Sequence, residues 1–201
     1  MSSESAKSYH HGNLREALLS AAREVLEREG VGALSLRGLA RKVGVSVMAP
    51  YHHFPDRKAL LVAVAISGFE ALQQSKLAVT SKSATATETL IQGSRNYIAF
   101  VINNPNLFRL MQSPELTDRK QYPDLHRAAT DPAKTLIRSI ETLSQEDGYS
   151  SLDVNSCAKT LWGLAHGIAI LALDGEISGE EALVLGANGA AAVISGWRRD
   201  S

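Results

Sequence analysis

The chain of 201 residues carries 21 Lys and Arg against 21 Asp and Glu, and its 44% hydrophobic and 21% charged content excludes wholesale disorder. A single cysteine, Cys157, excludes an internal disulfide framework and a multi-cysteine metal site. No apolar stretch approaches about 18 residues without a charge or a glycine, and the N-terminus lacks the apolar centre of a signal peptide, so we expect a soluble cytoplasmic protein without a membrane span.

The neutral total hides an uneven distribution of charge. Residues 1–58 hold nine basic and six acidic side chains, a net charge of +3, whereas residues 59–201 hold 12 basic and 15 acidic ones, a net charge of −3. Ordinary scatter of surface charge gives differences of this size, so the split acquires meaning only beside a motif.

Helical periodicity begins after an N-terminal arm. Residues 1–10 show no periodicity, which predicts a mobile arm. From Leu14 to Leu26 the apolar residues recur every three or four positions, as in an amphipathic helix. Asn13 is the candidate N-cap of this helix and Gly30 its candidate stop.

Two shorter helical segments are expected next. Ser35 is the expected N-cap of a helix over 36–43, and Gly44 interrupts that helix. Ser46 is then the expected cap of a third, very short segment over 47–53.

The remainder of the chain also has helical periodicity, and no strand signal or internal repeat interrupts it. The fold class predicted is therefore all-α, with about nine helices. Asp56 opens the fourth helix, which runs to about Leu77. Further helical segments are predicted at 90–103, 107–112, 125–146, 152–173 and 180–197, with loops at 80–87 and 115–124.

The segment over 35–54 reads SLRGLARKVGVSVMAPYHHF and carries the functional signal. Its apolar residues can pack two helices against the first one, and the short helix after Gly44 then presents small and polar residues outward. The DNA major groove admits a rigidly held short helix of this kind. The outward residues are Ser46, Val47, Met48, Ala49, His52 and His53, and the flanking basic residues able to reach phosphates are Arg37, Arg41, Lys42, Arg57 and Lys58.

The segment from about Asn13 to Leu72 resembles the N-terminal domain of the tetracycline-repressor (TetR) family of bacterial regulators. The matching pieces are NLREALLSAAREVLEREGVGALSLRGLARKVGVS and PYHHFPDRKALL. The resemblance implies a three-helix DNA-binding domain over 12–72, with its helix-turn-helix at 35–54, and a helical regulatory and dimerisation domain over 73–201. The resemblance and the outward residues together define the expected DNA-binding set, in which Met48 and Ala49 lie nearest the base edges. The set is Ser35, Arg37, Ser46, Val47, Met48, Ala49, Tyr51, His52, His53 and Lys58.

One tetrapeptide departs from the family pattern. Many members carry a Lys-Gly-Thr-Leu type sequence where this chain has Val47-Met48-Ala49-Pro50. Pro50 lacks an N–H group, but in the first turn of a helix capped by Ser46 it would remove only about one hydrogen bond. Few side-chain donors remain for bases, so we expect readout through Met48 and Ala49 on thymine methyls, through His52, and through DNA shape.

The C-terminal part resembles one regulatory-domain subgroup of the same family through LWGLAHGIAILALDGEI at 161–177, in which Trp162, His166 and Gly167 stand out. This resemblance implies a ligand cavity and a homodimer formed by the last two helices. The Ala- and Gly-rich segment 180–197 has the small residues that close helix pairing needs, although a tightly packed internal helix would need them too.

Candidate pocket residues are the aromatic, Met, His and Arg side chains of the middle helices, because small-molecule sites combine apolar walls with a few polar groups. Each of them also fits an ordinary core. Arg109, in the run LFRLM, can pair with an acid, reach solvent or hold an anionic effector. The set is Phe69, Tyr97, Phe100, Phe108, Arg109, Met111, His126, Trp162 and His166.

No motif of an enzyme, a cofactor or a metal site is present in the sequence. The expected function is therefore a ligand-responsive transcriptional regulator, most simply a dimeric repressor that leaves a palindromic operator when a small molecule of unknown identity binds. A helical interaction module with a vestigial helix-turn-helix is the alternative. His10 and His11 could bind a metal ion, but an arm that contacts DNA or a disordered arm explains them better.

Overall fold

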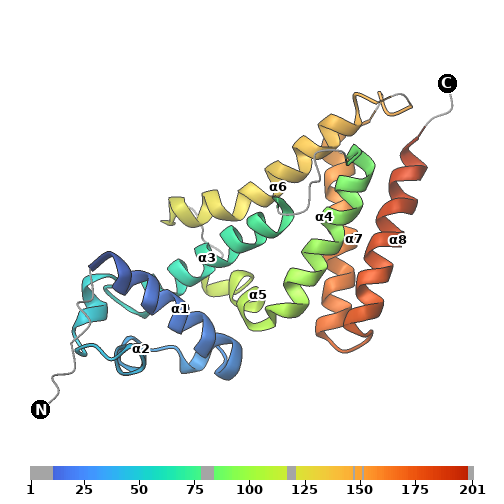
Figure 1. The fold of residues 1–201 in the computed structure, drawn as a ribbon. Coiled ribbons are helices and arrows are strands. Elements are labelled where there is room, and N and C mark those ends of the chain that lie inside the picture. The colour runs from blue at the N-terminus through green and yellow to red at the C-terminus, as the bar shows by residue number, and fades with distance from the viewer. Residues whose placement is uncertain (1–10, 78–83, 117–120, 147, 151, 199–201) are drawn as a thin grey trace, which may run out of the picture.

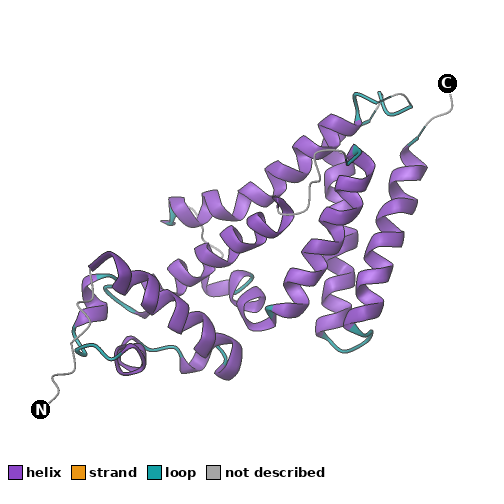
Figure 2. Cartoon of the chain, in the orientation of Figure 1, coloured by secondary structure: helices purple, strands orange, loops and turns teal. Residues whose placement is uncertain are grey.

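The computed structural model describes residues 11–77, 84–116, 121–146, 148–150 and 152–198. Within these ranges the chain forms eight α-helices and three short 3-10 helices and no strand, so the all-α prediction is confirmed (Figure 2). The α-helices are α1 His11–Glu29, α2 Leu36–Val43, α3 Arg57–Leu77, α4 Ala86–Asn103, α5 Pro105–Met111, α6 Pro123–Leu143, α7 Val154–Leu173 and α8 Gly179–Trp197.

The first two helices and the start of α3 form the part of the molecule that we call the head (Figure 1). The Ser35 hydroxyl accepts a hydrogen bond from the Gly38 backbone N–H at 3.1 Å, which caps α2 as predicted. Gly30 and Gly44 end α1 and α2 in conformations with φ near +79° and +78°, which glycine adopts without strain. These three residues confirm the local signals at the head.

Two predicted caps in the head were wrong. Helix α1 already includes His11, so Asn13 lies inside the helix and does not cap it. Ser46 caps no α-helix, because the segment predicted at 47–53 is a turn followed by the 3-10 helix Ala49–His52.

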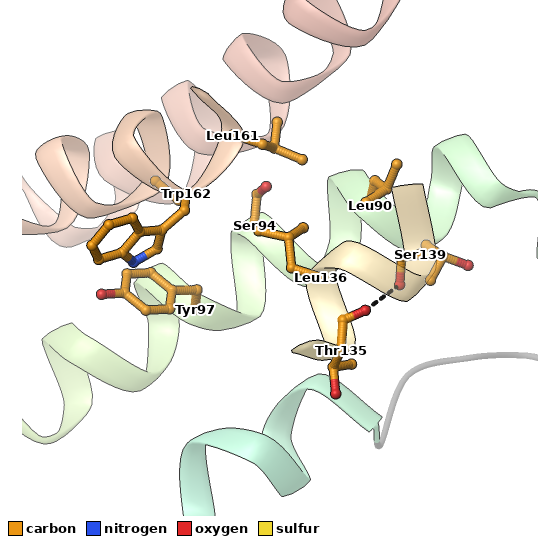
Figure 3. Close-up of a pocket in the computed structure, with 11 residues that line it drawn as sticks. Leu90, Ser94, Tyr97, Thr135, Leu136, Ser139, Leu161 and Trp162 are labelled. Atoms are coloured by element: carbon orange, nitrogen blue, oxygen red, sulfur yellow. Dashed lines mark hydrogen bonds between the residues drawn. The ribbon is translucent and has the colours of Figure 1, made fainter. Parts of the chain in front are cut away.

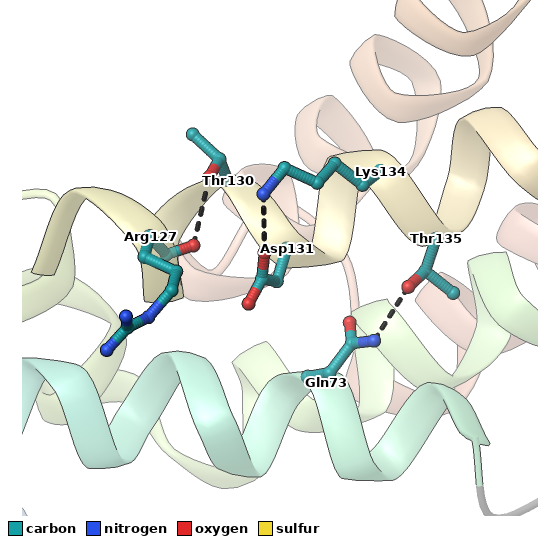
Figure 4. A network of polar contacts seen from close by, with 6 residues as sticks. All are labelled: Gln73, Arg127, Thr130, Asp131, Lys134 and Thr135. Atoms are coloured by element: carbon teal, nitrogen blue, oxygen red, sulfur yellow. Dashed lines mark hydrogen bonds and ion pairs between the residues drawn. The ribbon is translucent and has the colours of Figure 1, made fainter. Parts of the chain in front are cut away.

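The other helices form a layered body beside the head (Figure 1). Helix α6 packs along α3, while α4, α7 and α8 contact one another, and the short α5 lies between this group and α1. Gly186 on α8 allows the closest approach, since a Cβ at this position would overlap the buried Ile98 side chain of α4. Gln73 on α3 donates to Thr135 Oγ1 on α6 at 2.6 Å, which ties these two helices together (Figure 4).

Helix α4 begins earlier than predicted. Thr85 and Glu88 form a capping box, in which the Thr85 side chain accepts from the Glu88 N–H and the Glu88 carboxylate accepts from the Thr85 N–H. The backbone hydrogen bond from Thr85 holds the pKa of Glu88 below its usual value. Ala86 and Thr87, expected in a loop, are therefore helical. Residues 80–83 of that expected loop and the predicted arm over 1–10 lie outside the described residues.

Helix α7 is long and apolar enough, by length and composition, to cross a membrane, with a mean hydropathy of 1.3 over its most apolar window. Buried core helices of soluble proteins pass the same test. In this fold α7 packs against α4, α6 and α8, and only a third of that window is buried. Exposed apolar surface of this extent is typical of an interaction site.

Candidate functional site

The predicted DNA-reading segment is an exposed turn that is anchored by two buried residues. Pro50 and Phe54 are buried, whereas the Met48 side chain is 65% exposed and that of Val47 46% exposed. Tyr51 N–H donates to the Met48 carbonyl at 3.1 Å and His53 N–H to the Pro50 carbonyl at 3.0 Å, the spacing of a 3-10 helix. The sequence predicted a helical segment over 47–53, and the structure has a shorter 3-10 helix in its place. Pro50 has no N–H to donate, and the hydrogen bonds of this 3-10 helix come from other residues.

The exposed face of this turn is mainly apolar. Val47 and Met48 project furthest, Ser46 and His52 are exposed beside them, and Ala49 and His53 are half-buried. Tyr51, at 36% exposure, is partly covered. A face of this composition offers van der Waals surface to base edges and few hydrogen-bond donors.

The basic residues around the turn divide into engaged and available ones. Arg57 donates to the backbone carbonyls of Leu34 at 3.0 Å and Val31 at 2.7 Å, so it holds the loop before α2. Lys42 bonds Glu24 at 3.1 Å, and that hydrogen bond lowers the pKa of Glu24. Arg37, Arg41 and Lys58 are exposed, and the Lys58 ammonium lies 5.6 Å from the centre of the Tyr122 ring. The last three are the side chains available for phosphates.

A cavity of about 400 Å³ opens between α3, α4, α5, α6 and α7. Volumes of this order hold drug-sized ligands. The lining residues are Phe69, Leu72, Tyr97, Phe108, Met111, Gln112, Ala129, Thr130, Pro132, Ala133, Leu136, Ile137, Asn155, Ala158, Lys159 and Trp162. A neighbouring cavity of about 50 Å³ shares Tyr97, Leu136 and Trp162 with it (Figure 3).

The structure brings part of the predicted pocket set together. Phe69, Tyr97, Phe108, Met111 and Trp162 line the large cavity. The other predicted members lie elsewhere: Arg109 and His166 line a third, shallower cavity of about 320 Å³ between α5 and α7, Phe100 is buried without lining any of the three, and His126 is exposed on α6.

A polar pair separates the large cavity from the shallow one. The Tyr97 hydroxyl and His166 Nδ1 are 2.8 Å apart, and the Trp162 ring lies 5.5 Å from the His166 ring. Burial raises the pKa of Tyr97 to about 12 and lowers the pKa of His166. Both shifts favour the neutral forms, and the two groups share one hydrogen bond whose donor depends on the His166 tautomer.

Sequence reasoning missed the α6 wall and the start of α7. On α6 the cavity is lined by small and aliphatic residues whose spacing places them on one helical face, such as Ala129, Ala133 and Leu136. That periodicity was readable, but it does not distinguish a cavity wall from a packed core. Asn155 and Lys159 on α7 are ordinary surface residue types, and no sequence signal marked them.

A carboxylate joins the head to the helix that lines the cavity. Glu27, near the end of α1, accepts hydrogen bonds from the backbone N–H groups of Leu107 at 2.8 Å and Asn106 at 3.2 Å, at the N-terminus of α5. The Asn106 side chain donates back to the Glu27 carbonyl at 3.0 Å. Helix α5 also carries Phe108 and Met111 in the cavity wall, so it connects that wall to α1.

The last two helices expose large apolar side chains. Trp162 and Leu171 on α7 are 51% and 45% exposed, and Val184 and Leu185 on α8 are 55% and 42% exposed. Gly163 and Gly167 lie among them on the exposed side of α7, with space around the position of a Cβ. Such a surface is typical of an interface between helices.

Two family models match this chain. Residues 18–64 match the model of bacterial regulatory proteins of the tetR family, and residues 90–184 match a tetracyclin repressor-like C-terminal domain. The matched ranges together cover more than half of the sequence and include the DNA-reading segment and most of the cavity wall.

Two curated relatives match most of their own length. The nucleoid occlusion factor SlmA of Vibrio cholerae is 26% identical over 159 residues, 77% of this chain and 81% of that protein. YobS of Bacillus subtilis, an uncharacterized HTH-type transcriptional regulator, is 25% identical over 162 residues, 80% of this chain and 79% of that one.

Solved structures share the whole fold. A Rhodococcus protein of unknown function is 29% identical, with a TM-score of 0.84 over 96% of this chain and 100% of that chain. The transcriptional regulator FadR from Bacillus subtilis, in complex with stearoyl-CoA, has a TM-score of 0.71 over 92% of this chain and 100% of its own, but at 15% identity it supports only the fold.

Proposed function

This chain belongs to the tetR family of bacterial regulatory proteins, and from that premise we propose that it is a cytoplasmic repressor released from its operator by a small molecule bound in the large cavity. Membership makes the chain a DNA-binding transcriptional regulator and not an enzyme. The single observation that supports ligand control is the 400 Å³ cavity, whose wall includes α5, the helix that Glu27 joins to the head.

We place the DNA-binding domain at 12–72 and the regulatory and dimerisation domain at 73–201, with the Trp-His-Gly stretch marking the subgroup. The proposed DNA contacts are Ser35, Arg37, Ser46, Val47, Met48, Ala49, Tyr51, His52, His53 and Lys58. The apolar exposed turn supports readout by thymine methyl contact and DNA shape, and the exposed cations support phosphate contact.

Release follows from two connections between cavity and head. Helix α3 starts in the head at Arg57 and carries Phe69 and Leu72 into the cavity wall, and α5 reaches α1 through Glu27. A ligand that moves either helix changes the spacing of the two heads in a dimer, and couplings of this kind are worth about 1–3 kcal/mol.

Replacing Lys58 by alanine should weaken DNA binding on every sequence and flatten the dependence of log affinity on log salt by about one unit, because one phosphate contact is lost. Fluorescence anisotropy over a series of salt concentrations measures this slope. Lys134→Ala is the control, since Lys134 lies on α6 and pairs with Asp131 at 2.8 Å (Figure 4). An unchanged slope would remove Lys58 from the phosphate contacts.

Replacing Glu27 by alanine should lower the free energy of unfolding by about 1–2 kcal/mol, because the N-terminus of α5 loses its carboxylate acceptor. Urea denaturation measures the change. Glu24→Ala is the matched control on the same helix. Among the described residues Glu24 forms ion pairs with Arg28 and Lys42 at the surface, so its loss should destabilise the protein clearly less than that of Glu27. Equal losses in the two variants would show that Glu27 does not hold α5.

A second candidate function follows from the likeness to nucleoid occlusion factor SlmA over most of both chains. Chromosome-wide mapping of bound sites separates the two functions. A repressor occupies one or a few promoters, whereas a factor acting on the nucleoid occupies many dispersed sites. The cavity favours the repressor.

A further inference from the structure

The lining of the large cavity carries a single charge, and that charge is positive. Among its sixteen described lining residues, Lys159 carries the only charge, and most of the others are aliphatic or aromatic. No ion pair joins the Lys159 ammonium to a carboxylate among the described residues. The walls therefore accept an apolar body and offer a single positive group at one place.

Two exposed donors at the start of α7, Asn155 and Lys159, line the cavity. Asn155 and Lys159 are four residues apart on α7, so their side chains lie on one face of that helix. The acid next to them, Asp153, is committed to capping α7: it accepts from the N–H groups of Asn155 and Ser156 and from the Ser156 hydroxyl at 2.8 Å. Its carboxylate is thus already engaged, although its field still reaches Lys159.

The rest of the lining carries no charge. Among its polar groups, the Tyr97 hydroxyl is paired with His166. Phe69, Phe108 and Trp162 add aromatic, apolar surface, and Trp162 lies three residues from Lys159 on α7.

We infer that the effector is an amphipathic anion, with an apolar body and one carboxylate-type group that Lys159 and Asn155 hold at the start of α7. This inference rests on the proposed function, since it names the ligand class of the same cavity. A cationic amphiphile meets the wrong charge, and a small hydrophilic anion leaves the apolar walls unfilled.

Calorimetric titration of the DNA-free protein with three ligands of one chain length tests whether the cavity prefers an anionic head group. Decanoate, 1-decanol and decylammonium are each used below the concentration at which they aggregate. Decanoate should bind about tenfold more tightly than decanol at low salt, with the difference shrinking as salt rises, and decylammonium should bind most weakly. No binding of decanoate, or tighter binding of decylammonium than of decanoate, overturns the inference.

Two variants locate the contact. Lys159→Gln should reduce the affinity for decanoate about five- to tenfold and leave decanol unchanged, while Lys134→Gln, the control on α6, should change neither. Ala133→Trp should weaken both probes by filling the cavity, and the residue is exposed enough to tolerate the larger side chain. Equal decanoate affinity of Lys159→Gln and the unchanged protein overturns the inference.

A gel-shift with decanoate keeps the two proposals apart. Binding of decanoate that depends on Lys159 but leaves the DNA affinity unchanged upholds the ligand class and contradicts ligand-controlled release.

Discussion

Replacing Leu185 by glutamate is expected to convert the protein from a dimer to a monomer and to weaken operator binding by about 100-fold or more. Leu185 and Val184 are exposed on α8, which packs against α7, a helix that exposes Trp162 and Leu171. A glutamate buried there in a dimer would be an unpaired charge, which is strongly destabilising. Without the dimer, each head binds its half-site alone, and the gain from tethering is lost.

Sedimentation equilibrium measures the subunit association, and anisotropy measures the DNA affinity. Val31→Glu is the control for association, because Val31 is also an exposed aliphatic residue, at 41% exposure, but lies in the head. A Leu185→Glu variant that remains dimeric would move the interface away from α8.

Replacing Phe54 by alanine is expected to lower the free energy of unfolding by about 3–5 kcal/mol and to abolish DNA binding. The Phe54 side chain is 2% exposed, and the Arg15 guanidinium lies 5.5 Å from its ring centre. Phe54 N–H also donates to the Pro50 carbonyl at 2.9 Å. Its loss therefore removes the anchor of the exposed turn together with a large part of the head core.

Thermal and urea denaturation measure the stability of the variant. Tyr51→Ala is the control: it removes an aromatic ring from the same turn, but one that is 36% exposed, and it should change stability by less than about 1 kcal/mol. If Phe54→Ala unfolded no more easily than Tyr51→Ala, the turn would not depend on the buried ring.

Local rules predicted the head well where one residue decides the geometry. Ser35 caps α2, and Gly30 and Gly44 end helices, because a hydroxyl acceptor and a permissive φ act over a few residues. The same rules placed a cap at Ser46, where Pro50 four residues later favours a 3-10 turn. Residue propensities predict a turn at this position, but whether it forms an α-helix or a 3-10 helix depends on how Pro50 and Phe54 are buried.

The cavity was predictable only from its aromatic side. Phe69, Tyr97, Phe108 and Trp162 attract attention in a sequence because they are large. The α6 wall consists of residues such as Ala133 that are conspicuous only once the helices are placed. Contacts between distant residues, such as Glu27 with Leu107, depend on tertiary packing that no local pattern encodes.

The split of charge along the sequence has a structural counterpart. Among the five cations that flank the exposed turn, Arg37, Arg41 and Lys58 are available, while Lys42 and Arg57 are engaged within the protein. With so few free cations we expect low affinity for random DNA, so that specific binding depends on two heads acting together.

Selection from a library of random duplex DNA with the purified full-length protein tests the central claim most directly. A dimer with two equivalent heads should enrich an inverted repeat whose half-sites are separated by about one helical turn, with thymines at the positions that Met48 and Ala49 contact. Enrichment of no sequence at low salt, or of a single unrepeated site, would contradict the account of a two-headed operator-binding repressor.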